Sequence, residues 1–337
     1  MDKNYKEMKL LAIGDTVVNA FIRLKDAHVY CNLNKKECEL CLRFGDKIPY
    51  ESVTILPAVG NSANASICAS RLGLSVALMT NVGNDQYGKD CINKLMEEKI
   101  ETDFVEIEPG KKTNYHYILW YDTERTILVK HENFNREWKN IEISQKPKWI
   151  YLSSMGEDSL DFHNQILSYL NKNPGVKLAF QPGTYQIKFG TEKLKEIYYR
   201  TDSFFCNKEE AQKILNSKET NILNLSKEIA SLGPKNVFIS DAENGAYLYE
   251  NENLWYLPIY TNDKSPFERT GAGDAFSSTI VSYMAKNMSP VEAFKRGQIN
   301  SMSVIQYIGP HEGLLSYEKL EEYLKNAPEN YKLIKIN

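Results

Sequence analysis

The sequence predicts an α/β protein with a mostly parallel central sheet and helices on both of its faces. From Trp149 onward, short apolar runs typical of buried strands alternate with longer segments of helical periodicity. Such alternation implies strands joined by helical crossovers, which align the strands in parallel. The 337 residues contain no internal repeat and no low-complexity linker. We therefore expect one domain over residues 1–337, large enough for an extensive core.

The elements of the N-terminal half follow in order. An apolar run at 9–13 ends in Gly14-Asp15, which is typical of a buried strand that meets a turn. The charged stretch 16–57 does not resemble the interior of a doubly wound fold and is interpreted as an insertion. The remaining predictions are helices at 60–72 and 85–99, a strand at 75–82, and two strands within 113–132 that turn at 122–125.

The C-terminal half carries the alternation itself. Strands are predicted at 149–152, 177–180, 203–206, 236–240 and 246–249. Helices are predicted at 159–171, 208–215, 226–232, 270–286 and 290–307.

The composition indicates a soluble globular protein, with 42% hydrophobic and 25% charged residues. A net charge of −3 does not suggest a nucleic acid or an anionic membrane as partner. The apolar runs are far too short to cross a bilayer, and residues 1–7 lack the apolar segment of a signal peptide. We therefore expect a cytoplasmic protein, in which the six cysteines are thiols or metal ligands rather than disulfides.

Gly271-Ala272-Gly273-Asp274 is the most specific feature. Small residues allow close approach of a ligand to the backbone, and the N–H groups at the start of a helix favour an anion. The Asp274 carboxylate could take a proton from an attacking hydroxyl, so the segment fits phosphoryl transfer to an alcohol. A glycine-rich turn with an aspartate helix cap is the alternative.

Three weaker features also follow strand-like runs. The spacing of Asn207 and Glu210 suits water-mediated Mg²⁺ binding, although a helix cap is the commoner cause. The turn from Ser240 to Gly245 could hold a nucleotide or be an ordinary hairpin turn. Polar side chains after the first strand and at 60–64 could bind sugar hydroxyls or cap a helix; they are Asp15, Asn61 and Asn64.

Taken in this order, the segments resemble the PfkB family of carbohydrate kinases, also called ribokinase-like, from about residue 10 to 315. The signature at 268–276, Glu-Arg-Thr-Gly-Ala-Gly-Asp-Ala-Phe, is close to ideal. Departures from the family pattern are a single glycine before Asn61, Ser240-Asp241-Ala242 in place of Thr-x-Gly, and Glu268 in place of a frequent Asp. The last departure concerns the monovalent-cation site of some members.

The resemblance implies a ribokinase-like fold with a small β lid formed by segments near 16–57 and 104–136. It implies ATP and Mg²⁺, and a homodimer through the lid. The resemblance implies that Asp274 is the base. It also implies that the turn starting at Gly271 stabilises the transferring phosphoryl group through the N–H groups of Ala272, Gly273 and Asp274. Asp15, Gly60, Asn61 and Asn64 would bind substrate; Asn207, Ser240, Gly245 and Asn300 would bind nucleotide; Glu210 would serve the metal.

The resulting prediction is an ATP-dependent phosphotransferase that acts on a hydroxymethyl group of a small sugar. An adenosine-like nucleoside kinase on the same scaffold is the close alternative. An inactive nucleotide-binding regulator is less favoured, because the segment from Gly271 to Asp274 is intact. A dehydrogenase is disfavoured, since no Gly-x-Gly-x-x-Gly follows the first strand.

The insertion also contains a spacing that suits structural zinc. His28, Cys31, Cys38 and Cys41 are a Cys₃His set with two short spacings around a loop. Ordinary thiols in a loop are the alternative.

Overall fold

A computed structural model describes residues 8–32, 38–122, 124–142, 145–262 and 264–336. Its centre is a ten-stranded sheet that is parallel from β13 to β7 and antiparallel from β13 to β16. The strands, in spatial order, are β16 (Ile334–Lys335), β15 (Asn253–Leu257), β14 (Ala246–Glu250), β13 (Asn236–Ser240), β12 (Ser203–Asn207), β11 (Lys177–Phe180), β10 (Trp149–Leu152), β1 (Leu10–Ile13), β6 (Val76–Gly83) and β7 (Val105–Glu108).

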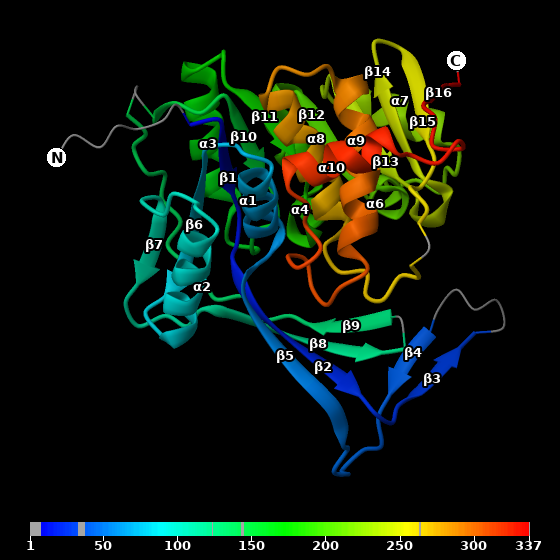
Figure 1. Cartoon of the computed structure of the whole chain (residues 1–337). Coiled ribbons are helices and arrows are strands. Elements are labelled where there is room, and N and C mark those ends of the chain that lie inside the picture. The colour runs from blue at the N-terminus through cyan, green and yellow to red at the C-terminus, as the bar shows by residue number, and fades with distance from the viewer. Residues whose placement is uncertain (1–7, 33–37, 123, 143–144, 263, 337) are drawn as a thin grey trace.

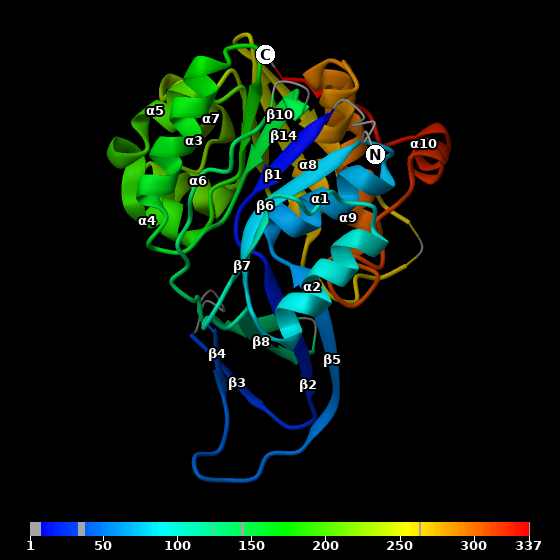
Figure 2. The ribbon, with the colours of Figure 1, turned by 90° about the vertical axis from the view of Figure 1, so that its left-hand side faces the viewer.

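Helices cover both faces of this sheet (Figures 1 and 2). Alternate residues of β1 divide between two cores, with Leu10 and Ala12 in one and Leu11 and Ile13 in the other, as expected for a strand buried on both faces. The first core packs under α1 (Asn61–Arg71), α2 (Gln86–Glu97), α8 (Ala272–Ala285), α9 (Pro290–Val304) and α10 (Tyr317–Lys325). The second packs under α3 (Leu160–Lys172), α4 (Thr184–Lys193), α5 (Lys195–Arg200), α6 (Lys208–Ile214) and α7 (Ile222–Ser231).

A second, four-stranded sheet projects from the body as a lid (Figure 1). Its strands lie in the order β5 (Tyr50–Val59), β2 (Val17–Leu24), β8 (Asn114–Tyr121) and β9 (Glu124–Leu128). Strands β2 and β8 are parallel, whereas the two outer pairs are antiparallel. The predicted α/β class and the small β lid are therefore confirmed. Strand β7 lies inside the segment near 104–136 but pairs with β6 in the large sheet.

The zinc prediction in the insertion is not supported. The insertion carries a further hairpin of β3 (His28–Cys31) and β4 (Cys38–Cys41), in which Cys31 and Cys38 form a disulfide. Sulfurs joined to each other cannot act as thiolate ligands, and no group of three or more His, Cys, Asp or Glu suited to a metal occurs among the described residues. The expectation of thiols or metal ligands was thus wrong for this pair.

None of the helices in the described part of the chain has the length and apolar character needed to cross a bilayer.

Candidate active site

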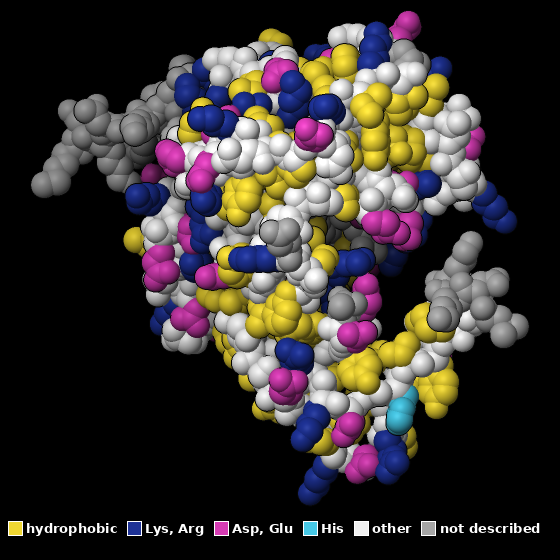
Figure 3. Space-filling view, turned by 45° about the vertical axis from the view of Figure 1, so that its right-hand side comes forward, with side chains coloured by type: hydrophobic (Ala, Val, Ile, Leu, Met, Phe, Trp, Pro, Cys, Tyr) yellow, Lys and Arg dark blue, Asp and Glu magenta, His cyan; other side chains and the backbone are white. Residues whose placement is uncertain are grey.

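The candidate site is a cavity of about 610 Å³ between the body and the lid. Figure 3 shows the recess between the two parts from one side. The strands β1, β10, β11, β12 and β13 all point their carboxyl ends toward it, and residues at or just beyond those ends line it. This is the edge at which open parallel sheets bind ligands. The side chains that line it at these strand ends are Asp15, Ser154, Gln181, Asn207 and Ser240.

The predicted phosphate turn forms the start of α8. Gly271 has a φ of 84°, and a Cβ there would lie 2.4 Å from the Cβ of Pro310, so only glycine fits. At Gly273, in contrast, the nearest atom to an added Cβ would be the Gln181 amide nitrogen at 4.0 Å. The cavity is open beside the first turn of the helix, where N–H groups have no partner within the helix. This space suits a phosphoryl group.

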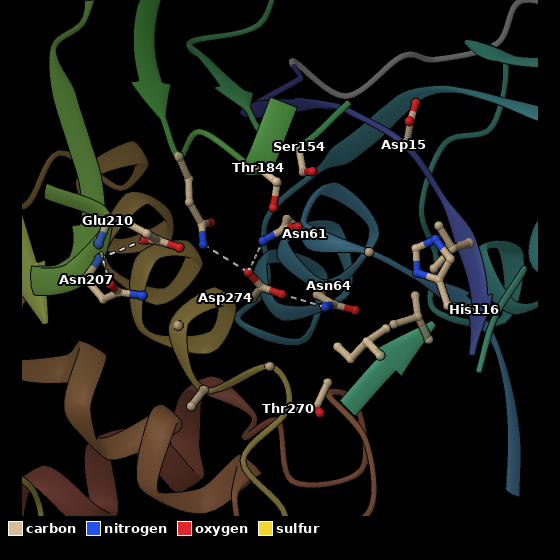
Figure 4. Close-up of a pocket in the computed structure, with 18 of the residues that line it drawn as sticks. Asp15, Asn61, Asn64, His116, Ser154, Thr184, Asn207, Glu210, Thr270 and Asp274 are labelled. Atoms are coloured by element: carbon tan, nitrogen blue, oxygen red, sulfur yellow. Dashed lines mark hydrogen bonds between the residues drawn. The ribbon is translucent and has the colours of Figure 1, made fainter. Parts of the chain in front are cut away.

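Asp274 lies in that first turn and is almost fully buried. Its carboxylate accepts hydrogen bonds from the amides of Asn61 (2.7 Å), Asn64 (2.6 Å) and Gln181 (3.0 Å) (Figure 4). Burial raises the pKa of Asp274, and this effect outweighs the three amide hydrogen bonds, which favour the charged form. A raised pKa with a fixed orientation is what a general base requires.

A histidine that the sequence did not reveal fixes one of these amides. His311 lies 2.9 Å from the Oδ1 of Asn64 through its Nε2. Burial lowers the pKa of His311 to about 3, so the ring is neutral and donates to the Asn64 oxygen. The Asn64 NH₂ group is thereby turned toward Asp274.

Asn207 and Glu210 lie on the other side of Asp274 from Asp15 and His116 (Figure 4). The two residues cap α6 reciprocally: Asn207 Oδ1 accepts from the Glu210 N–H, and a Glu210 carboxylate oxygen accepts from the Asn207 N–H, both at 2.8 Å. The commoner interpretation of this spacing, a helix cap, is therefore correct. Both residues nevertheless line the cavity. Burial, and secondarily the charge of Asp274, raises the pKa of Glu210.

The Glu210 carboxyl group fits a hydrated Mg²⁺. A cation beside it would offset the negative charge of Asp274, which is one of the causes that raise the pKa of Glu210. Mg²⁺ typically takes one or two protein carboxylates and keeps several waters. The residues that would hold it are Glu210 and, through water, Asn207.

Asp15 lies on the side of Asp274 that faces away from Asn207 and Glu210 (Figure 4). Hydrogen-bond donors of the protein already occupy its carboxylate. Arg136 donates to both oxygens, at 2.8 and 3.1 Å, and the Gly156 N–H (2.9 Å) and His131 (3.2 Å) also contact it. Burial alone would raise the pKa of Asp15. The hydrogen bond to His131 and the charge of Arg136 outweigh it, and the pKa is lowered. Asp15 is thus ionised and held in place.

The other predicted residues divide between the cavity and the core. Gly60 and Ser240 line the cavity, and Gly60 has a φ of 109° with the Asp15 carbonyl 2.6 Å from the position of a Cβ. Gly245 serves a turn instead, since a Cβ there would meet the Leu257 carbonyl oxygen at 2.4 Å. Asn300 is fully buried and bonds Thr279 and the Leu315 N–H in the core, at 2.8 and 3.0 Å. The structure does not place Gly245 or Asn300 among the cavity residues.

Among the residues that sequence reasoning missed, one carried a usable signal. Gln181 follows the predicted strand 177–180 directly, so the rule that singled out Asn207 and Ser240 also applied to it. Arg136, His131 and His311 come from loops, where the sequence contains no comparable pattern.

Comparisons with known proteins agree with this geometry. A family model described as pfkB family carbohydrate kinase matches residues 14–316. Mouse (Mus musculus) ribokinase is 24% identical over 260 residues, which are 74% of this chain and 79% of that protein.

Two solved structures share the fold. Arabidopsis thaliana ribokinase, complexed with ribose and ATP, superposes with a TM-score of 0.76 at 16% identity, covering 95% of this chain and 99% of that one. A nucleoside kinase from Methanocaldococcus jannaschii gives a TM-score of 0.74 at 16% identity, covering 96% and 100%. The match of the family model over most of the length, together with this likeness, shows that the chain belongs to the pfkB family of carbohydrate kinases.

Proposed function

We propose that the protein is an ATP-dependent kinase that phosphorylates a hydroxymethyl group of a small sugar, with Asp274 as general base. The observation that carries the proposal is the environment of Asp274. It is a buried carboxylate with a raised pKa, oriented by three amides, in the first turn of a helix that opens on the cavity. Membership of the family supports the reaction class.

In the proposed mechanism, the sugar lies on one side of Asp274 and the nucleotide on the other. The acceptor hydroxyl lies near Asp274, which takes its proton as the oxygen attacks the terminal phosphorus of ATP. The N–H groups of Ala272, Gly273 and Asp274 stabilise the charge on the transferring group, and Gly273 leaves room for it. Glu210 would hold Mg²⁺, whose positive charge would offset that of the phosphates. Asn207 and Ser240, which also line the cavity, would contact the nucleotide.

The lid completes this arrangement, because it covers the acceptor end and excludes water that would otherwise hydrolyse ATP. A cytoplasmic location, where ATP is available, is part of the proposal. The structural likeness to a nucleoside kinase keeps nucleosides as a second class of acceptor to be assayed.

The test is ATP consumption with Mg²⁺ and a panel of D-ribose, D-fructose, D-glucose, D-gluconate and adenosine. Replacing Asp274 with Asn removes the base, so turnover is expected to fall about 10²–10⁴-fold. ATP affinity should stay within a few-fold. Because only the carboxylate form accepts a proton, wild-type turnover should fall as the pH drops through the raised pKa of Asp274.

The matched control is Asp161→Asn, which changes an exposed aspartate in the first turn of α3. It should leave turnover unchanged. An Asp274→Asn enzyme that kept more than about a tenth of wild-type turnover would contradict the assignment of the base. A wild-type protein that binds ATP but consumes none with any acceptor would favour a nucleotide-binding regulator.

A further inference from the structure

Gln181, one of the three amides that bond Asp274, has a second set of partners that the mechanism does not use. Its Nε2 donates to the Asp274 carboxylate at 3.0 Å, whereas its Oε1 faces two hydroxyl groups. The Tyr151 hydroxyl donates to this oxygen, and the Ser277 hydroxyl lies 3.0 Å from it. The two hydroxyl oxygens are themselves 2.7 Å apart. The four side chains therefore form one continuous hydrogen-bonded series that ends at the proposed base.

The two hydroxyl groups come from the core rather than from the cavity. Tyr151 lies on β10 and is fully buried, and Ser277 follows Gly273 by one turn of α8 and is 1% exposed. Gln181 is fixed beside them, because its N–H donates to the Leu152 carbonyl of β10 at 2.9 Å. Neither Tyr151 nor Ser277 is among the described residues that line the cavity, whereas Gln181 is. Any effect of the two hydroxyls on a reaction must therefore pass through Gln181.

The two ends of the Gln181 amide have opposite requirements. An ionised carboxylate only accepts hydrogen bonds, so Asp274 requires the NH₂ end, and the carbonyl oxygen must then face a donor. With the amide turned round, its oxygen would face the carboxylate of Asp274 and meet no donor there. Hydroxyl donors at Oε1 therefore favour the orientation that stabilises the charged form of Asp274. The Ser277 hydroxyl also lies 2.8 Å from the Gly273 carbonyl oxygen, so its single proton has a competing acceptor and Tyr151 is the principal donor.

The same arrangement occurs at a second amide. His311 holds the oxygen of Asn64, just as Tyr151 holds that of Gln181, and in both cases the NH₂ group faces Asp274. Burial, and secondarily the charge of Asp274, raises the pKa of Tyr151 well above its usual range, so its hydroxyl keeps the proton that it donates.

We propose that Tyr151 and Ser277 are positioning residues of the transfer reaction, which hold the Gln181 NH₂ group toward Asp274 and so keep that carboxylate ionised and oriented. The proposal rests on the proposed function, since it assumes that Asp274 is the base. The charges of Arg125 on β9 and Glu210 on α6 also act on Asp274, and the substitutions below leave both of them in place.

The kinetic test is a double-mutant cycle, measured with an acceptor that the wild-type enzyme consumes. Tyr151→Phe should lower kcat about 3- to 10-fold, as expected for one hydrogen bond, and leave KM for the acceptor within about twofold. In a Gln181→Leu background the same substitution should have no further effect, because the residue through which it acts is gone. Tyr260→Phe is the control. It removes a buried hydroxyl that donates to the Tyr323 carbonyl at 2.9 Å, and it should leave kcat unchanged.

A second measurement does not depend on turnover. The side-chain ¹⁵N–¹H signals of Gln181, assigned by their loss in Gln181→Leu, should shift in NMR spectra as Asp274 titrates. In Tyr151→Phe and in Ser277→Ala the midpoint of this shift should move upward by roughly 0.3–1 pH units, because a weaker hydrogen bond to the carboxylate raises its pKa further. The midpoint should stay at its wild-type value in Tyr260→Phe. A purely structural role of Tyr151 would lower stability without moving the midpoint.

The proposal is overturned if the midpoint is the same in Tyr151→Phe and Ser277→Ala as in wild type, or if the effects of Tyr151→Phe and Gln181→Leu on kcat simply multiply. The proposed function fails separately. Midpoints that move as expected in a wild-type protein and variants that consume no ATP with any acceptor would leave the positioning of Asp274 standing and remove the kinase assignment.

Discussion

At the scale of single residues, Gly273 is a glycine that the protein's own packing does not require. Its φ is not in the left-handed region, and an added Cβ would meet no atom within 4 Å other than the Gln181 amide nitrogen at 4.0 Å. Gly271, two residues earlier, is needed for its φ of 84° and for the approach of Pro310. The space at Gly273 is therefore best explained by a ligand that occupies it.

Gly273→Ala should consequently separate stability from activity. The free energy of unfolding should stay equal or rise by up to about 1 kcal/mol, because alanine favours the helix. Turnover should fall at least about 10-fold, since a methyl group enters the space proposed for the phosphoryl group. Thermal denaturation and steady-state kinetics measure the two effects.

Gly175→Ala is the control for this substitution, because its Cβ would also meet nothing within 4 Å and its φ is not positive. It should change neither quantity appreciably. Wild-type turnover in Gly273→Ala would show that the phosphoryl group lies elsewhere.

The sequence predicted site residues well where a chemical motif follows a strand and less well where a role depends on distant contacts. Asp274, Asn61 and Asn64 were singled out and do lie together. The two asparagines were expected to contact a substrate, but in the structure they donate to the Asp274 carboxylate. Gln181 and His311, which fix this geometry, lie far away along the chain. Such long-range pairing leaves no periodic trace in a sequence.

At the scale of elements, two ion pairs connect the lid strand β9 to the segment just before α8. Arg125 on β9 lies 3.7 Å from Glu268, which is 1% exposed, and Glu124 lies 3.7 Å from Arg269. Glu268 also accepts hydrogen bonds from the Thr270 N–H and hydroxyl, at 2.8 and 2.6 Å, just before α8. The lid strand β9 thus contacts the residue that holds the turn just before α8.

Arg125→Met should therefore weaken catalysis through the position of the lid. The partly buried pair is expected to contribute about 1–2 kcal/mol, so kcat/KM for the acceptor should fall roughly 5- to 30-fold. Steady-state kinetics at varied acceptor concentration measure the effect, and ATP hydrolysis without acceptor should rise as water enters.

Glu124→Gln serves as the control, because it breaks the other pair, whose side chains are both more than half exposed. Exposed pairs contribute little, so its kcat/KM should change less than about twofold. Equal effects of the two substitutions would contradict a special role for the inner pair.

Helices and strands were predicted correctly where the hydrophobic pattern of the sequence was unambiguous. Strands β10, β11 and β13 lie at the predicted residues because each is a short apolar run buried on both faces. Helices α4, α5 and α10 and the strands β15 and β16 at one end of the large sheet were not predicted. These two strands owe their pairing to neighbours rather than to their own composition.

At the scale of the whole molecule, the outer face of the lid presents an apolar row across all four strands. Ile55, Ala20, Tyr117 and Leu128 are aligned by the strand register, from β5 to β9. Ile55, Tyr117 and Leu128 are each about half exposed, whereas Ala20 is buried. Large apolar side chains gathered on an exposed sheet face often mark a contact between proteins. We propose that a second copy of this chain covers it, giving a homodimer through the lid.

Ile55→Asp tests this assembly, because a charge within an apolar interface would be buried without a partner and should destabilise a dimer strongly. Sedimentation velocity over a concentration series is expected to show a dimer for wild type and a monomer for the variant. The control is Ile107→Asp on β7, which changes an isoleucine of similar exposure on the edge of the large sheet and should leave the dimer intact. A wild-type monomer at all concentrations, or a dimer that both variants retain, would place the contact elsewhere. If the lid is an interface, Ile55→Asp should also raise KM for the acceptor, since Asn19 and His116 of the same sheet line the cavity.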